Sequence, residues 1–117
     1  MVVEVIVTDE FRTWYEALND RDTAAVFHVV SLLEQRGVHL GFPYCSAIRT
    51  SRYGLRELRA QSGRRALRVL YAFDVRRQAV LLLGGDKSGT KQFYATAVPL
   101  AEQLWETYVS ELQKEKP

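Results

Sequence analysis

The stretch "LRELRAQSGRRALRVLYAFD", residues 55–74, constrains the fold most, because it indicates a β-hairpin. Its two halves, residues 55–60 and 65–74, are rich in apolar residues and flank "QSGR", a glycine-containing turn of the kind that joins antiparallel strands. A second turn, "VRRQ", leads into "AVLLLGG", residues 79–85, an apolar run typical of a strand that is covered on at least one face. Three strands joined by short turns predict a mainly antiparallel sheet.

The segments before the hairpin predict one more strand and two helices. The β-branched run "VVEVIV", residues 2–7, indicates a strand, and Thr8 is placed to cap the helix that follows. Residues 22–36 predict a second helix that ends at Gly37. Residues 38–54 contain glycine and proline without clear periodicity, so we expect a connecting loop there. The buried stripe of the first helix would consist of Phe11, Trp14, Tyr15 and Leu18.

The last part of the chain predicts a polar loop followed by a third helix. Residues 86–98 form the loop, and Pro99 suits the first turn of the helix. The resulting order, β-α-α-β-β-β-α, predicts an α+β fold, with two N-terminal helices and one C-terminal helix packed on one face of a small, mainly antiparallel sheet.

Length and composition favour an ordinary globular protein. The 117 residues suit a single domain over 1–117, and 47% of them are hydrophobic and 26% charged. No run approaches the roughly 20 apolar residues that span a bilayer, and the N-terminus lacks the pattern of a signal peptide. A single cysteine, Cys45, excludes an intrachain disulfide and leaves too few thiols for a zinc cluster. We therefore expect a cytoplasmic protein without a membrane partner.

The positive charge is concentrated in the middle of the chain. Residues 49–91 hold eleven Arg and Lys against three Asp and Glu, whereas the segments on either side are acidic. Such a block creates a local field that attracts polyanions. The alternative is a set of solvated charges spread over several faces of the domain.

The alternation of residues in the hairpin separates its side chains into two faces. Arg68 falls with Leu70 and Ala72, and on the neighbouring strand Glu57 falls with Arg59. A cross-strand pair between Glu57 and Arg68 would neutralise part of the charge. One glutamate leaves most of the arginines unpaired, so an anionic partner is expected on this sheet.

The run "LRELR…GRRALRVLYAFD…AVLLLGGDKSG…FYATAVPLAEQLWETYV" resembles the RelE-type toxins of the RelE/ParE superfamily, and more closely their phage-derived, HigB-like branch. The resemblance covers roughly residues 50–112, and the β-α-α start agrees with the RelE/ParE fold. It implies the toxin of a type II toxin–antitoxin system, an endoribonuclease that cuts mRNA on the ribosome and uses no metal or other cofactor. Its partners would be mRNA on the ribosome and a cognate antitoxin, expected to be a helix-turn-helix DNA-binding protein.

The resemblance also assigns roles to individual residues. Arg68 matches the arginine that would clamp the phosphate, Lys87 a basic catalytic or phosphate-binding residue, and Tyr94 an aromatic hydroxyl that acts as a base or stacks on a nucleobase. The flanking RNA backbone would be held by Arg56, Arg59, Arg65 and Lys91.

Each assignment has a structural alternative. Arg68 could serve only as the partner of Glu57 or Asp74, Lys87 could be simply solvated, and Tyr94 could belong to the core. At the level of function, a non-catalytic toxin that binds a protein target such as DNA gyrase, as ParE does, and a plain RNA-binding module remain the two alternatives.

Overall fold

The computed structural model describes residues 2–89 and 92–115, and it confirms the predicted α+β class. Its elements follow the predicted order with one additional strand. No described helix is long and apolar enough to cross a membrane. In chain order the helices and strands are β1 Val5–Val7, α1 Asp9–Glu16, α2 Asp20–Arg36, the 3-10 helix η1 Gly37–His39, β2 Cys45–Ala47, β3 Arg56–Ser62, β4 Arg65–Phe73, β5 Ala79–Asp86 and α3 Phe93–Lys114.

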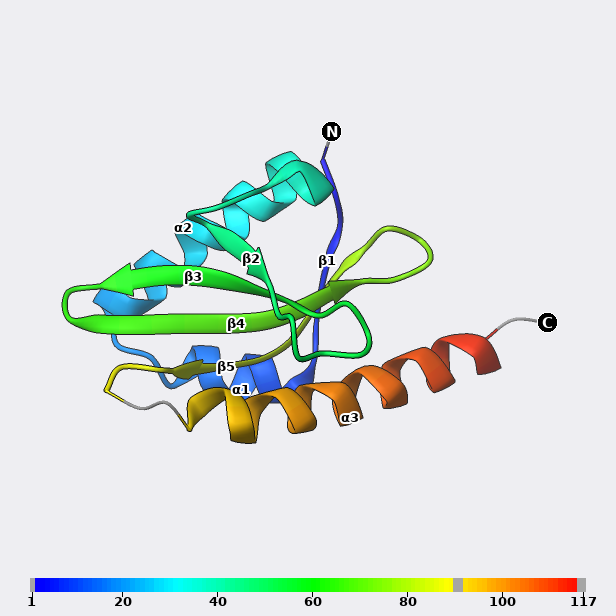
Figure 1. Ribbon diagram of the computed structural model, residues 1–117. Coiled ribbons are helices and arrows are strands. Elements are labelled where there is room, and N and C mark those ends of the chain that lie inside the picture. The colour runs from blue at the N-terminus through cyan, green and yellow to red at the C-terminus, as the bar shows by residue number, and fades with distance from the viewer. Residues whose placement is uncertain (1, 90–91, 116–117) are drawn as a thin grey trace.

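Within the described residues, five strands form one sheet in the order β1-β5-β4-β3-β2 (Figure 1). β1 runs parallel to β5, and all other neighbours are antiparallel. The predicted hairpin of β3 and β4 is confirmed, and Gly63 in its turn has a φ of 59°, a conformation that glycine adopts far more easily than other residues. Arg59 lies directly opposite Arg68, so both side chains belong to the same face of the sheet.

Helices cover both faces of this sheet, as the positions of α2 and α3 in Figure 1 show. On one face α1 and α2 pack against the odd-numbered residues Leu67, Val69 and Tyr71 of β4. On the other face α3 packs against Leu70 and Ala72. The prediction that all helices share one face is therefore wrong. The physical reason is that β4 carries apolar side chains on both of its faces, and both must be removed from water.

Two helix-end signals read from the sequence are confirmed. The Thr8 hydroxyl oxygen accepts the Phe11 N–H at 3.1 Å, and the hydroxyl donates to the Leu82 carbonyl at 2.6 Å, which ties the start of α1 to β5. Gly37 ends α2 with a φ of 55°, and an added Cβ at this position would lie 2.8 Å from the Val3 side chain. Positive φ and close approach both explain a glycine here.

Other boundaries differ from the sequence prediction. The expected loop over residues 38–54 contains the last two residues of η1 and all of β2. At three residues, β2 is too short to show a periodicity. The first strand begins at Val5 rather than at residue 2.

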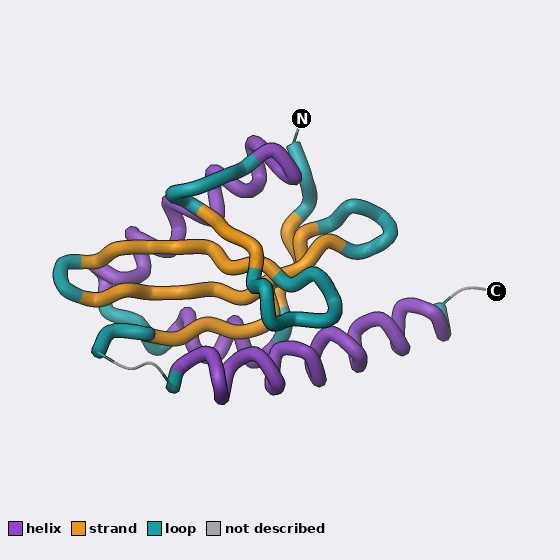
Figure 2. Tube along the Cα trace, in the orientation of Figure 1, coloured by secondary structure: helices purple, strands orange, loops and turns teal. Residues whose placement is uncertain are grey.

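The third helix starts at Phe93 and contains Pro99, six residues before the predicted start. Pro99 lacks the N–H that would bond the Ala95 carbonyl, but Phe93, Tyr94, Ala97 and Val98 pack on the sheet and offset this loss. Figure 2 shows α3 running beside the strands and continuing past them toward the C-terminus. The early start of α3 places Tyr94 over the sheet, where the candidate site lies.

Candidate functional site

A buried ion pair lies on the α3 face of the sheet. Arg68 of β4 and Glu57 of β3 are diagonal neighbours, because Glu57 is two residues from Arg59, which lies opposite Arg68. Arg68 Nε and Glu57 Oε1 are 3.6 Å apart, and the two residues are 5% and 6% exposed. The ion pair between Glu57 and Arg68, which the alternation of side chains along the strands allowed, is therefore present. It is enclosed on a face that is otherwise lined by apolar side chains.

Glu57 is the centre of a hydrogen-bond network that joins three elements to its carboxylate. The Tyr94 hydroxyl donates to Oε1 at 2.5 Å, and the Ser46 hydroxyl donates to Oε2 at 2.9 Å. Arg59 Nη1 also donates to Oε2, at 3.4 Å. Since both oxygens are held, the carboxylate has a fixed orientation. Hydrogen bonds from charged and neutral donors are what allow a carboxylate to be buried.

Arg68 is less completely satisfied than Glu57. Its Nη1 donates to the Leu67 carbonyl at 3.0 Å, whereas its buried Nε has no hydrogen-bond partner among the described residues. Almost all buried donors in folded proteins have such a partner. The 3.6 Å separation from Glu57 supplies electrostatic attraction without a hydrogen bond. An oxygen of an incoming anion would satisfy this N–H.

Tyr94 is held as a hydrogen-bond donor. Burial, in the first place, and its hydrogen bond to Glu57 raise the pKa of the Tyr94 hydroxyl, and the Arg68 guanidinium beside it opposes part of this rise. The hydroxyl thus keeps its proton at neutral pH. This arrangement favours a role in orienting the Glu57 carboxylate over the alternative in which Tyr94 itself accepts a proton.

Two cations border the pair on opposite sides, each with an aromatic ring. Lys87 Nζ lies 5.7 Å from the centre of the Tyr94 ring, and the Lys87 backbone N–H is fixed by the Ala66 carbonyl at 2.9 Å. The Arg59 guanidinium lies 5.3 Å from the centre of the Phe42 ring. Arg59 and Arg68 thus lie against the Glu57 carboxylate, and Lys87 lies beside Tyr94, which bonds that carboxylate. Three cations near one carboxylate leave the site with a positive surplus.

Arg56 and Arg65 are placed elsewhere. Arg56 lies on the α2 face of β3, where its Nη2 donates to Cys45 Sγ at 3.4 Å, and this hydrogen bond raises the pKa of Arg56. Arg65 lies at the hairpin end, 2.6 Å from the buried Asp22 of α2 and 3.0 Å from Asp86 of β5.

The structure thus brings Arg59, Arg68, Lys87 and Tyr94 together but separates Arg56 and Arg65 from them. Lys91 lies outside the described residues.

Two residues of the site were not among the predicted site residues. Glu57 had been considered only as a structural partner of Arg68, although its position as the one acid in residues 49–73 marked it as unusual. Ser46 gave no signal, because it comes from the short edge strand β2. The other acid considered, Asp74, does not pair with Arg68. It accepts the backbone N–H groups of Arg76 and Gln78 and the Tyr108 hydroxyl.

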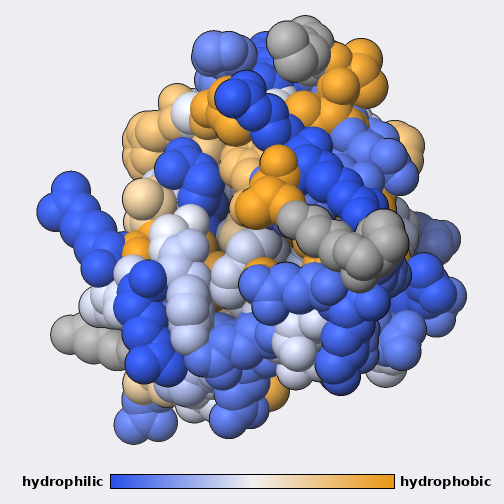
Figure 3. All heavy atoms as spheres, turned by 90° about the vertical axis from the view of Figure 1, so that its right-hand side faces the viewer, coloured by the Kyte–Doolittle hydropathy of each residue, from blue (hydrophilic) through white to orange (hydrophobic). Residues whose placement is uncertain are grey.

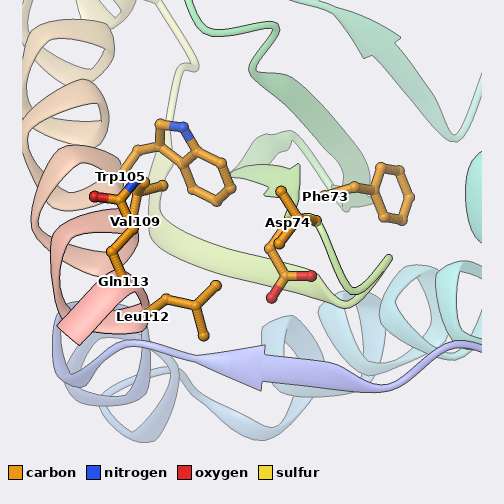
Figure 4. A pocket seen from close by; sticks show the side chains of 7 residues that line it. Phe73, Asp74, Trp105, Val109, Leu112 and Gln113 are labelled. Atoms are coloured by element: carbon orange, nitrogen blue, oxygen red, sulfur yellow. The ribbon is translucent and has the colours of Figure 1, made fainter. Parts of the chain in front are cut away.

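One hollow of the described surface lies away from the ion pair. A pocket of about 230 Å³ opens between the β4–β5 turn and the C-terminal half of α3, and it is lined mostly by apolar side chains (Figure 4). On the side of the molecule that carries this end of α3, hydrophobic residues form small groups between hydrophilic ones (Figure 3). The one carboxylate in the pocket, that of Asp74, already holds three donors. The groups around Glu57 are therefore the candidate functional site.

No group of three His, Cys, Asp or Glu side chains that could hold a metal ion occurs in the described part of the chain. The donors around Glu57 are instead cations and hydroxyl groups, which suit an anionic oxygen.

Comparison with known proteins shows the family of this chain. Residues 13–106 match the family of phage derived proteins described as Gp49-like (DUF891). The protein named "Putative toxin HigB3" from Mycobacterium tuberculosis is 38% identical over 108 residues, which cover 91% of this chain and 93% of that protein. "Putative toxin HigB2" from the same organism is 32% identical over 112 residues, 93% of this chain but only 56% of the relative's own length. The chain belongs to the phage derived Gp49-like family.

Proposed function

We propose that this protein is the toxin of a toxin–antitoxin system and that it acts as an endoribonuclease on mRNA bound to the ribosome. The observation that carries the proposal is the enclosed Glu57–Arg68 pair, in which the Arg68 Nε–H makes no hydrogen bond to any described residue. The names of two relatives as toxins support the first part. The resemblance to RelE-type toxins supports the second.

Cleavage of RNA by its own 2′-hydroxyl requires a base, a cation at the phosphate and an acid for the leaving oxygen. In the proposed reaction the Glu57 carboxylate accepts the 2′-hydroxyl proton, and the 2′-oxygen attacks phosphorus. The bond between phosphorus and the 5′-oxygen breaks, and Lys87 donates a proton to that oxygen. The products are a 2′,3′-cyclic phosphate and a free 5′-hydroxyl.

Arg68 and Tyr94 have supporting roles in this scheme. The unsatisfied Nε of Arg68 donates to a phosphate oxygen, where it stabilises the charge that develops on the pentavalent phosphorus. Tyr94 holds Glu57 Oε1 until the substrate hydroxyl takes its place at that oxygen. Because the chain's own side chains supply base, cation and acid, the reaction needs no bound metal.

The closure of the site supports the dependence on the ribosome. The side chains of Arg68 and Glu57 are 6% and 8% exposed, so a flexible RNA in solution meets a covered pair. A strand held extended in the ribosomal decoding site is already oriented, which removes much of the entropic cost of reaching the site. The antitoxin, proposed to be a helix-turn-helix protein, would silence the toxin by binding it.

The test is single-turnover cleavage of mRNA on programmed ribosomes, with the new ends identified chemically. Glu57→Gln keeps the shape of the side chain and removes the base, so we expect cleavage to fall at least about a hundredfold. Glu106→Gln is the matched control, since Glu106 also accepts a tyrosine hydroxyl but is exposed on α3. Growth arrest with intact mRNA and damaged DNA would overturn the proposal and favour a gyrase-binding toxin.

A further inference from the structure

Phe42 is an aromatic residue that the fold does not explain. It is 75% exposed and belongs to neither of the two apolar clusters that cover the sheet. A single exposed apolar residue is common on protein surfaces and means little by itself. What distinguishes Phe42 is its neighbour, because the Arg59 guanidinium lies 5.3 Å from the centre of its ring.

The position of Phe42 relative to the site is fixed by backbone hydrogen bonds. The Gly41 carbonyl accepts the N–H groups of Tyr44 and Cys45 at 3.0 and 3.2 Å, which closes a turn around Phe42. The Arg59 N–H donates to the Tyr44 carbonyl at 2.8 Å, so this turn is joined to β3 at Arg59 itself. The turn that carries Phe42 is therefore held beside β3 at Arg59, the residue whose side chain contacts both the Phe42 ring and the Glu57 carboxylate.

Arg59 connects this ring to the reacting groups. Its Nη1 is 3.4 Å from Glu57 Oε2, and Glu57 in turn faces Arg68. On the other side of the pair, Lys87 lies over the Tyr94 ring. The ion pair thus has one cation–aromatic pair on each side. Proteins that bind single-stranded nucleic acid combine these two elements, a cation near the backbone and an aromatic ring for a base.

We propose that Phe42, flanked by Arg59, is a stacking subsite for one unpaired nucleobase next to the cleaved phosphate. This inference rests on the proposed endoribonuclease function and adds a place where the substrate strand is gripped. The charge of the neighbourhood favours RNA over a protein partner, because the surroundings of Phe42 supply a guanidinium rather than an apolar groove. The larger apolar groove, lined by Val5, Phe11, Tyr15 and Phe27, lies instead at β1, α1 and α2.

The experiment measures stacking directly, with a short single-stranded RNA that carries 2-aminopurine, whose fluorescence falls when the base stacks. Phe42→Leu keeps an apolar side chain and removes the aromatic face, so we expect about tenfold weaker binding and loss of quenching. Phe42→Trp should retain both the binding affinity and the quenching of the wild type. Phe27→Leu is the matched control, since Phe27 is 63% exposed but lies on α2, and it should bind like the wild type.

The outcomes separate the subsite from the catalytic proposal. Unchanged quenching and affinity in Phe42→Leu would overturn the subsite while leaving the proposed cleavage intact. Loss of antitoxin binding in that variant, with RNA binding unchanged, would overturn it as well and identify Phe42 as a protein contact. If the wild-type protein quenches the probe through Phe42 but never cleaves mRNA, the subsite stands and the proposed cleavage fails. Thermal unfolding of each variant should match the wild type, because both phenylalanines are exposed.

Discussion

Replacing Tyr94 with phenylalanine is the cleanest single test of the network around Glu57. The change removes the hydroxyl that donates to Glu57 Oε1 at 2.5 Å and keeps the ring. The ring contacts with Phe93, at 5.1 Å between centres, and with Lys87, at 5.7 Å, therefore survive. Oε2 keeps its bonds from Ser46 and Arg59. The variant thus loses one charge-assisted hydrogen bond and little packing.

The size of the effect follows from the loss of this one hydrogen bond. A hydrogen bond to a charged group contributes about 1.5–3 kcal/mol, and Tyr94 is only partly buried, so we expect the free energy of unfolding to fall by about 1–2 kcal/mol. The freed Oε1 can also turn toward Arg68 Nε, now 3.6 Å away, which would pair the proposed base with the proposed phosphate cation. A misorientation that costs about 1.4 kcal/mol in the transition state lowers the rate tenfold. We therefore expect cleavage to drop at least about tenfold.

Single-turnover cleavage on programmed ribosomes gives the rate, and ribosome binding is measured separately. Binding should stay level, because no cation is lost. Tyr53→Phe is the control, since the Tyr53 hydroxyl donates to the exposed Glu106 and lies outside the network. A full cleavage rate in Tyr94→Phe would refute the reasoning that this hydroxyl orients the base.

Three further predictions test the cation, the scaffold and the response to alkali. Arg68→Ala should slow cleavage about a hundredfold by removing the proposed phosphate cation, whereas Arg76→Ala in the β4–β5 turn should leave the rate unchanged. An equal loss of cleavage rate in both variants would mean that only the total charge of the protein matters for cleavage. Arg65→Ala should lower the free energy of unfolding, measured in urea, by about 2 kcal/mol, because it leaves the buried Asp22 without its ion partner. The cleavage rate of the folded protein should be unchanged. An unaltered urea midpoint would contradict this structural role of Arg65. Burial and the hydrogen bond to Asp74 raise the pKa of Tyr108 to about 12, above the ordinary value near 10. Because the folded state holds this proton more tightly than the unfolded state, the free energy of unfolding should fall as pH rises between these two values. Tyr108→Phe should flatten that part of the curve of unfolding free energy against pH.

Local pattern was enough to predict the hairpin and which of its side chains share a face. The period of two in β3 and β4 placed Glu57, Arg59 and Arg68 where their register has them. The same period placed Arg56 with Leu58, on the opposite face, so its exclusion from the site was readable from the sequence. The prediction that Arg56 binds RNA together with the other arginines considered its charge and neglected the direction of its side chain.

Contacts between distant segments could not be read in this way. Arg65 is neutralised by Asp22, which lies 43 positions earlier in the chain and faces it only after α2 has packed on the sheet. Ser46 reaches Glu57 because a three-residue strand joins the edge of β3. Tyr94 covers Glu57 because α3 begins before its proline and occupies the second face. Each of these three contacts depends on tertiary packing, which overrides the local pattern of the sequence.

The α3 face of the sheet is otherwise a hydrophobic interface, and this makes the Glu57–Arg68 pair informative. Well-packed apolar side chains at buried ion-pair positions are often neutral or stabilising, so stability alone gives little reason for a charged pair. The pair here is also asymmetric: Glu57 has hydrogen-bond partners on both oxygens, whereas the buried Nε of Arg68 has none among the described residues. A donor left in that state raises the free energy of the resting protein. Under the proposed function, the same donor would give an incoming phosphate oxygen a hydrogen bond that the resting site leaves unmade. The under-satisfied arginine and the fixed carboxylate are together what a site poised for an anionic substrate requires.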